Sequence, residues 1–139
     1  MRALVTRLGH DTVRFAAPAT ASRCARAGGI VLQGVTGGNG ALAWLRTPDS
    51  VAGGSWPLLQ RGDTVSPRGA TIAIRWVVGD IAHGAAFDSG TVAVTRTARD
   101  VTVRASGTGM EASIGRVALQ ATFAAVPVGS DTVTCASRL

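Results

Sequence analysis

His83 is the residue in this chain whose neighbours are best suited to acid–base chemistry. Asp80 and Asp88 flank it and Ser89 follows, so the side-chain types of a Ser-His-Asp triad occur close together. In an extended strand, however, side chains an odd number of residues apart point to opposite faces, which separates His83 from both aspartates. The nucleophile pattern GxSxG is absent. We therefore predict a surface or strand position for His83 and keep hydrolysis only as a remote alternative.

Other residues that could bind a metal, a phosphate or a sugar are dispersed. His10 is the second of two histidines, Glu111 is the only Glu, and no CxxC pair or Cys/His cluster occurs. The glycine-rich segment 34–40 lacks the Lys-Ser/Thr ending of a P-loop, so a hairpin connection is predicted there. In the adhesion-like triplet 61–63 (RGD), Asp63 is expected to cap a turn. We expect no catalytic site, no metal, no cofactor and no enzymatic activity.

Two cysteines, Cys24 and Cys135, lie near opposite ends of the chain. A disulfide between them would close almost the whole domain into one loop, and such bonds persist in oxidising compartments. The alternative is a pair of buried free thiols in a cytosolic protein. We predict the Cys24–Cys135 disulfide and an extracytoplasmic location, in the periplasm or cell envelope.

The first twenty residues do not resemble a secretory signal peptide. They contain Arg2, Arg7, His10, Asp11 and Arg14 and no apolar stretch of the required length. Either export uses another route, the biological start differs, or the cysteines are free thiols. Nowhere does an apolar run approach the 18 residues of a membrane-spanning helix, so we expect no span.

The basic residues are unevenly distributed. All 14 are Arg, against seven Asp and one Glu, which gives a net charge of +6. Residues 1–22 carry Arg2, Arg7 and Arg14 with Asp11 as their one acid, so we predict a basic N-terminal arm preceding a single domain over 23–139. The arm would attract an anionic partner, or would be a solvated leader without one.

Strict alternation of apolar and polar residues indicates β-strands through most of the chain. Four segments show it most clearly, at 70–78, 90–97, 100–106 and 115–126. Weaker candidates lie at 12–16, 29–35, 41–46, 56–61 and 131–135. The apolar positions of the four clear strands predict a core of Ile72, Ile74, Trp76, Val92, Val94, Val101, Val103, Val117, Leu119 and Phe123.

Glycine- and Asp-containing turns separate these segments at short intervals. We expect hairpins at Asp88-Ser89-Gly90 and near Arg99-Asp100, a turn at Gly107-Thr108-Gly109, and a meander from Ile72 to Phe123. The predicted fold is an all-β, single-domain antiparallel β-sandwich or flattened barrel of about eight short strands. A strand near Cys24 would lie beside the last strand, which fits the disulfide.

The polar faces of the predicted strands suggest where a partner could bind. Arg75, Arg104 and Arg116 share the outward parity of three strong strands and would form a basic stripe if those strands were neighbours. Trp56 precedes Pro57, which implies an edge strand where an exposed Trp56 could anchor a partner. Only six aromatic residues occur, and none is Tyr, so nucleic acid is not the expected partner.

Together these features favour a non-enzymatic, extracytoplasmic accessory or structural subunit that works through protein–protein contacts. Its partner would be a larger cell-envelope or membrane-associated assembly, of which a bacterial photosynthetic reaction-centre complex is one example. The alternative is a module that binds a small ligand, carbohydrate or lipid. The predicted contact residues are Arg2, Arg7, Arg14, Trp56, Arg75, Arg104 and Arg116.

Overall fold

The computed structural model describes residues 1–7, 9–26 and 28–135, and these residues form an all-β single domain. The ten strands are β1 (Arg2–Arg7), β2 (Val13–Ala16), β3 (Thr20–Cys24), β4 (Ile30–Thr36), β5 (Asn39–Arg46), β6 (Gly54–Trp56), β7 (Gly69–Val78), β8 (Ile81–Arg96), β9 (Asp100–Glu111) and β10 (Gly115–Val133). The predicted fold class is confirmed, with more strands than the alternation alone indicated. The described residues include no helix long and apolar enough to cross a membrane.

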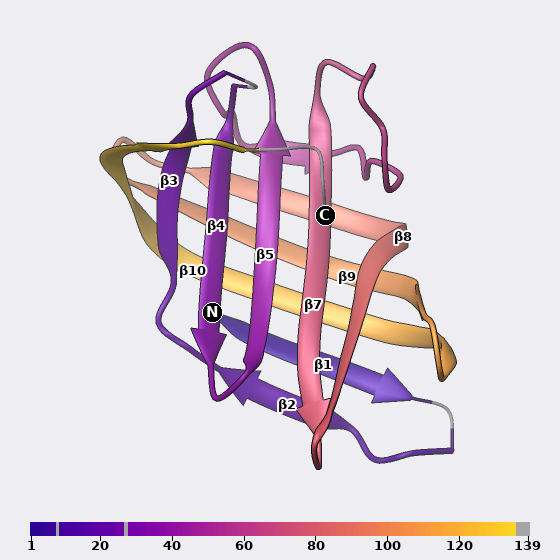
Figure 1. The fold of residues 1–139 in the computed structure, drawn as a ribbon. Coiled ribbons are helices and arrows are strands. Elements are labelled where there is room, and N and C mark those ends of the chain that lie inside the picture. The colour runs from indigo at the N-terminus through magenta and orange to yellow at the C-terminus, as the bar shows by residue number, and fades with distance from the viewer. Residues whose placement is uncertain (8, 27, 136–139) are drawn as a thin grey trace.

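The strands form two layers that cross at a steep angle (Figure 1). The front layer consists of β3, β4, β5, β7, the first part of β8 and the last part of β10. The back layer consists of β2, β1, the first part of β10, β9, the second part of β8 and β6. Because β8 and β10 each belong to both layers, the hydrogen-bonded strands close into a flattened barrel.

Both long strands bend where they pass between the layers. The register of β8 against β9 shifts between Phe87 and Ser89, and that of β10 against β9 shifts between Phe123 and Val126. Within the second shift Ala125 has a φ of 45°, and its N–H donates to the Thr102 hydroxyl at 2.8 Å. Such bulges let one strand turn a corner and serve two sheets.

Alternation along the strands places one set of side chains between the layers, as predicted. In β7, Ile72, Ile74 and Trp76 are buried while Arg75 faces solvent. All ten residues of the predicted core belong to one buried cluster. The meander is confirmed too, since β7, β8, β9 and β10 pair antiparallel in chain order.

Two predicted turns are wrong. Their glycines lie within paired strands, where they allow the two backbones to approach closely. The segments 88–90 and 107–109 lie inside β8 and β9, where Gly90 faces Gly107 across the ladder. A Cβ on Gly90 would overlap the carbonyl oxygen of Ser106, and one on Gly107 would overlap that of Ser89. Glycine is required here because the two backbones lie closer than side chains allow.

The predicted N-terminal arm is also wrong. Residues 1–22 contribute β1, β2 and the start of β3, and β1 lies between β2 and β10 in the back layer. Ala3 and Val5 enter the core. The alternation in β1 uses alanine as an inward residue, which weakens the sequence signal although the pattern has the correct period.

The region around Trp56 differs from the predicted strand over 56–61. β6 ends at Trp56 because Pro57 cannot donate to a ladder, and beyond it Leu58 forms an isolated parallel bridge with Ala70. β6 pairs with β8 alone among the described strands, so the expected edge position is confirmed.

The two chain ends meet as the predicted disulfide requires. The end of β10 runs parallel to β3, with Val133 opposite Cys24. Cys24 and Cys135 form a disulfide with 5.3 Å between their Cα atoms.

Candidate functional site

His83 and Glu111 form a nearly buried pair at one end of the space between the layers. His83 lies opposite Trp76 in the β7–β8 ladder, and the two rings stack with 5.6 Å between centroids. The Nδ1 atom of His83 lies 3.2 Å from Oε1 of Glu111, the last residue of β9. The sequence did not indicate this contact, because it joins residues 28 positions apart.

Hydrogen bonds keep the Glu111 carboxylate charged despite its burial. Oε2 accepts bonds from the hydroxyl and the backbone N–H of Ser113, both at 2.8 Å, and from the N–H of Ile114 at 2.7 Å. Burial raises the pKa of this carboxyl, but the bonds from Ser113, His83 and Ile114 outweigh it, so the pKa of Glu111 lies below its ordinary value.

This arrangement does not have the order of a catalytic triad. In a triad the imidazole lies between the carboxylate and the nucleophile, whereas here the carboxylate lies between His83 and the Ser113 hydroxyl. Asp80 is in the exposed turn between β7 and β8, and Asp88 pairs with Arg116. Within the described ranges, no three His, Cys, Asp or Glu side chains are placed to hold a metal ion. The pair therefore ties the end of β9 to β8.

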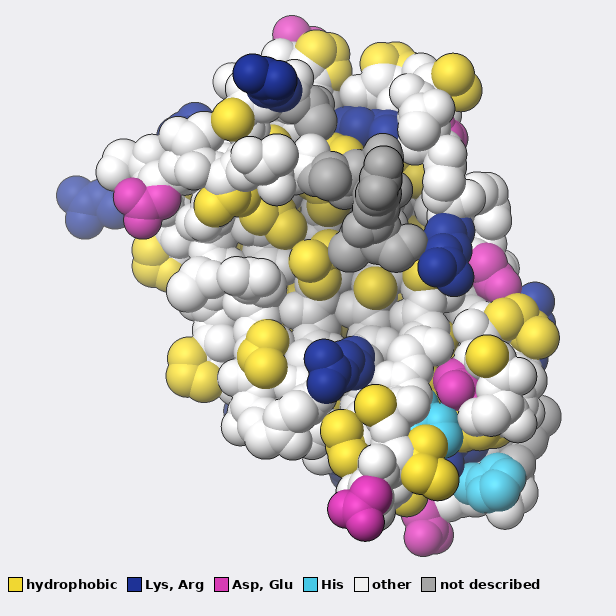
Figure 2. Space-filling view, viewed as in Figure 1, with side chains coloured by type: hydrophobic (Ala, Val, Ile, Leu, Met, Phe, Trp, Pro, Cys, Tyr) yellow, Lys and Arg dark blue, Asp and Glu magenta, His cyan; other side chains and the backbone are white. Residues whose placement is uncertain are grey.

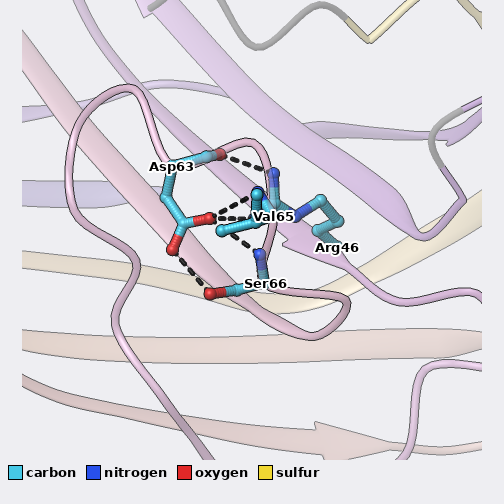
Figure 3. Close-up of polar contacts among 4 residues, drawn as sticks. All are labelled: Arg46, Asp63, Val65 and Ser66. Atoms are coloured by element: carbon cyan, nitrogen blue, oxygen red, sulfur yellow. Dashed lines mark hydrogen bonds and ion pairs between the residues drawn. The ribbon is translucent and has the colours of Figure 1, made fainter.

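Asp63 organises the long connection between β6 and β7 (Figure 3). Its Oδ1 accepts from the N–H groups of Val65 (3.0 Å) and Ser66 (2.9 Å), and its Oδ2 accepts from the Ser66 hydroxyl (2.6 Å). Arg46, which is buried, donates to Oδ1 at 3.1 Å and to the Asp63 carbonyl oxygen at 2.7 Å. The predicted turn-capping role of Asp63 is confirmed, and its carboxylate is occupied within the protein.

These bonds make the connection sensitive to acid. The hydrogen bonds from Ser66, together with those from Val65 and Arg46, lower the pKa of Asp63 from 3.8 to about 2. A carboxyl whose pKa is lower in the folded state contributes stability above its unfolded pKa, and that stability is lost as pH falls through the folded pKa.

We expect Asp63→Asn to be less stable than the wild type at pH 7, with the difference shrinking as pH falls from about 4 to about 2. Urea unfolding of both proteins at a series of pH values measures it. Asp49→Asn is the matched control, because it removes an exposed aspartate whose carboxylate forms no hydrogen bond among the described residues. A difference that does not change with pH would contradict the assigned role.

Two of the predicted contact residues are inside the protein. Trp56 is only 4% exposed, its Nε1 donates to the Ala52 carbonyl oxygen at 3.0 Å, and the Arg68 guanidinium lies 4.2 Å from its ring centroid. The expectation of an exposed Trp56 anchor is wrong, because an edge strand can still turn one face to the core. Arg7 is also buried, at the inward-facing end of β1, where its Nε donates to the Asp11 carbonyl oxygen.

The predicted stripe of Arg75, Arg104 and Arg116 does not form. Arg75 belongs to the front layer, whereas Arg104 and Arg116 lie on adjacent strands of the back layer. Arg116 is paired with Asp88 at 2.8 Å and also donates to the Thr108 hydroxyl. The three arginines do point outward from their strands, as predicted. They are not all neighbours, because β8, which follows β7, carries the chain from one layer to the other.

A different set of arginines gathers on the outer side of the back layer. Arg2 of β1 and Arg104 of β9 both lie opposite Thr122 of β10, so the three form one row across the strands. Arg14 of β2 lies opposite Leu4, two residues along β1 from Arg2. All three arginines are exposed. We call Arg2, Arg14 and Arg104 the basic face.

No acid neutralises the basic face within the part of the chain that the structure describes. None of its three arginines forms an ion pair with a described residue. Two adjoining hollows open on this side, one beside Arg2 and Arg104 and the other beside Arg2 and Arg14, and neither lining includes an acid. The basic face therefore presents three guanidinium groups and two adjoining hollows to a partner.

The sequence indicated each arginine of the basic face as a contact residue, but did not indicate that the three lie together. Arg2, Arg14 and Arg104 were each candidates, but Arg2 and Arg14 were assigned to an arm and Arg104 to a separate stripe. The parity of residues 2–7 would have placed Arg2 on an outward face, whereas the neighbour relation of β1, β10 and β9 comes only from the fold.

Comparisons with protein-family models, with curated proteins and with solved structures returned no match.

Proposed function

We propose that this protein is a non-enzymatic, extracytoplasmic accessory subunit that docks through its basic face onto an acidic surface of a larger protein assembly. The observation that carries the proposal is the alignment of Arg2, Arg104 and the adjacent Arg14 on one exposed sheet face without acidic partners among the described residues. The paired strands fix the spacing of the three arginines along one face, which favours recognition of a matching set of carboxylates.

The chemistry of the face favours a protein partner over nucleic acid. Arg presents a planar fork of donors that fits both carboxylates and phosphates, so the difference between the two partners lies in the aromatic residues of the face. Proteins that bind single-stranded nucleic acid also stack bases on exposed aromatic rings. Phe15, the aromatic residue among those lining the two hollows, instead packs against the core.

The disulfide supports an oxidising compartment. Cys24–Cys135 joins the two ends of the domain, and such structural bonds persist mainly outside the reducing cytosol. We place the protein in the periplasm or cell envelope, in contact with a membrane-associated assembly of the kind that a bacterial photosynthetic reaction-centre complex exemplifies.

Reversing the charge of the basic face should weaken docking and leave the fold intact. We expect the triple variant Arg2→Glu, Arg14→Glu, Arg104→Glu to lose at least about tenfold in affinity for the assembly, because rim charges control encounter and specificity. Raising the salt concentration should weaken wild-type binding in the same direction, since exposed charge pairs are screened over about 8 Å at physiological ionic strength. Co-purification with a membrane complex, followed by titration against that complex, measures both effects.

The matched control reverses three exposed arginines elsewhere, Arg23, Arg26 and Arg99. Both triple variants lower the formal net charge from +6 to zero, so a general charge effect would weaken them equally. Arg7 is excluded from the test because it is buried, and its replacement would disturb the fold. Equal binding by the wild type and the basic-face variant at low salt would overturn the proposal.

A further inference from the structure

An apolar groove lies on the outer side of the front layer, on a different surface from the basic face. It has a volume of about 680 Å³ and runs over β4, β5, β7 and the first part of β8, with Met110 of β9 at one side. Figure 2 shows this side of the molecule hollowed in its middle, with hydrophobic side chains along the margins of the hollow. Its volume lies within the range of small-molecule sites.

The groove exists because the outward positions at its centre carry almost no side chain. Gly40 and Gly84 lie on either side of Arg75 in the ladder. Two residues further along the strands, Ala73 and Ala86 face each other. A Cβ on Gly84 would meet no atom closer than 3.7 Å, so the space above that residue is open. The floor is therefore the bare surface of a sheet.

Exposed apolar side chains line the margins. Val35 is 67% exposed and Met110 is 55% exposed, although both are large hydrophobic residues, and Leu42 adds a half-buried side chain. Large apolar side chains that stay exposed around a concave surface indicate a site that an apolar ligand covers.

Arg75 supplies a positive charge to the groove. Among the described residues that line it, Arg75 and Arg61 are the charged ones. Arg75 is exposed, forms no ion pair with a described residue, and has only glycines directly across from it on both neighbouring strands. Its guanidinium group is therefore accessible to an anion bound over the groove.

The hydrogen-bonded backbone at the floor of the groove favours a hydrocarbon chain over a peptide as the ligand. The strands β4, β5, β7 and the first part of β8 are paired in successive ladders, so their amide groups are used within the sheet. An extended peptide lying on this surface would bury its own N–H and C=O groups without partners, which is costly. A hydrocarbon chain carries no such groups.

We propose that this groove binds a single-chain fatty acid, with the hydrocarbon chain on the glycine and alanine floor and the carboxylate on Arg75. This inference concerns a second surface and does not depend on docking through the basic face.

Titration calorimetry with dodecanoate, at concentrations where it is monomeric, tests the proposal. We expect saturable binding at one site with a Kd below roughly 1 mM, and binding at least about tenfold weaker for dodecyltrimethylammonium, which has the same chain and a cationic head. Hexanoate should bind more weakly than dodecanoate, because it buries less hydrocarbon. No saturable binding of dodecanoate, or equal binding of the cationic amphiphile, would overturn the proposal.

Two kinds of variant locate the site. Arg75→Gln should weaken dodecanoate binding by about tenfold, as expected for loss of a hydrogen bond to a charged group, whereas Arg104→Gln on the basic face should not. Ala73→Leu or Ala86→Leu should fill the groove and reduce the affinity by a similar factor, with Ala118→Leu on the back layer as the control. If Arg75→Gln, or both leucine variants in folded form, bind as the wild type does, the proposed site is wrong. Because Arg75, Ala73 and Ala86 do not belong to the basic face, this outcome is separate from any failure of docking.

Discussion

Replacing Phe123 by alanine is expected to lower the free energy of unfolding by about 3–5 kcal/mol, a large part of the 5–15 kcal/mol typical of a domain. Phe123 has no exposed surface and lies on β10, opposite Val103 of β9 and beside the bend where β10 passes between the layers. Removal of its ring leaves a cavity that the paired strands around it cannot collapse to fill.

Urea unfolding of the wild type and the variant measures this loss, and Phe15→Ala is the matched control. Phe15 lies on β2 at the edge of the back layer and is only partly buried, so the same chemical change should cost clearly less there. A loss below about 1 kcal/mol for Phe123→Ala would contradict its place in the core.

Removal of the disulfide should destabilise the protein by a similar amount. Cys24 and Cys135 are 111 residues apart, and closing a loop of that size stabilises the folded state by about 4–5 kcal/mol in the chain-entropy model. We expect Cys24→Ser, Cys135→Ser and the double variant to lose equal amounts, because each breaks the same bond. Urea unfolding of these variants, and of the wild type with and without a reductant, measures the effect.

Thiol labelling provides the independent check on the disulfide. The unfolded, unreduced wild-type protein should react with no thiol reagent, and the reduced protein should react at both cysteines. Labelling of two cysteines without reduction would contradict the disulfide and remove the main support for an oxidising compartment. A normal labelling result with a small change in stability would instead show that β3 and β10 remain paired without the bond.

The two proposed surfaces predict different behaviour in solution. Docking by the basic face depends on long-range attraction and should weaken as salt is added. Binding in the apolar groove depends mainly on buried hydrocarbon and should respond little to salt, apart from the contribution of Arg75. The basic face and the groove lie on the outer sides of opposite layers, so both could be occupied together.

The residues of the core could be predicted from the sequence because side-chain direction in a strand has a period of two. Ile72, Ile74 and Trp76 on β7 needed only that local rule to be placed inward. The same rule placed Arg75 and Arg104 outward. The pairing of Cys24 with Cys135 was predictable for another reason, because a chain with two cysteines allows one intramolecular bond.

Features that depend on which strands are neighbours came only from the tertiary structure. The sequence does not encode locally that β8 and β10 change layers, so Gly90 and Gly107 resembled turn residues although they face each other inside a ladder. The same crossing separates Arg75 from Arg104, and the pairing of β1 with β10 brings Arg2 toward Arg104. Alternation fixes the face of the strand on which a side chain lies, because it follows from the geometry of a single strand. The residues beside it are fixed by hydrogen bonds between segments far apart in the chain, and these form only when the barrel closes.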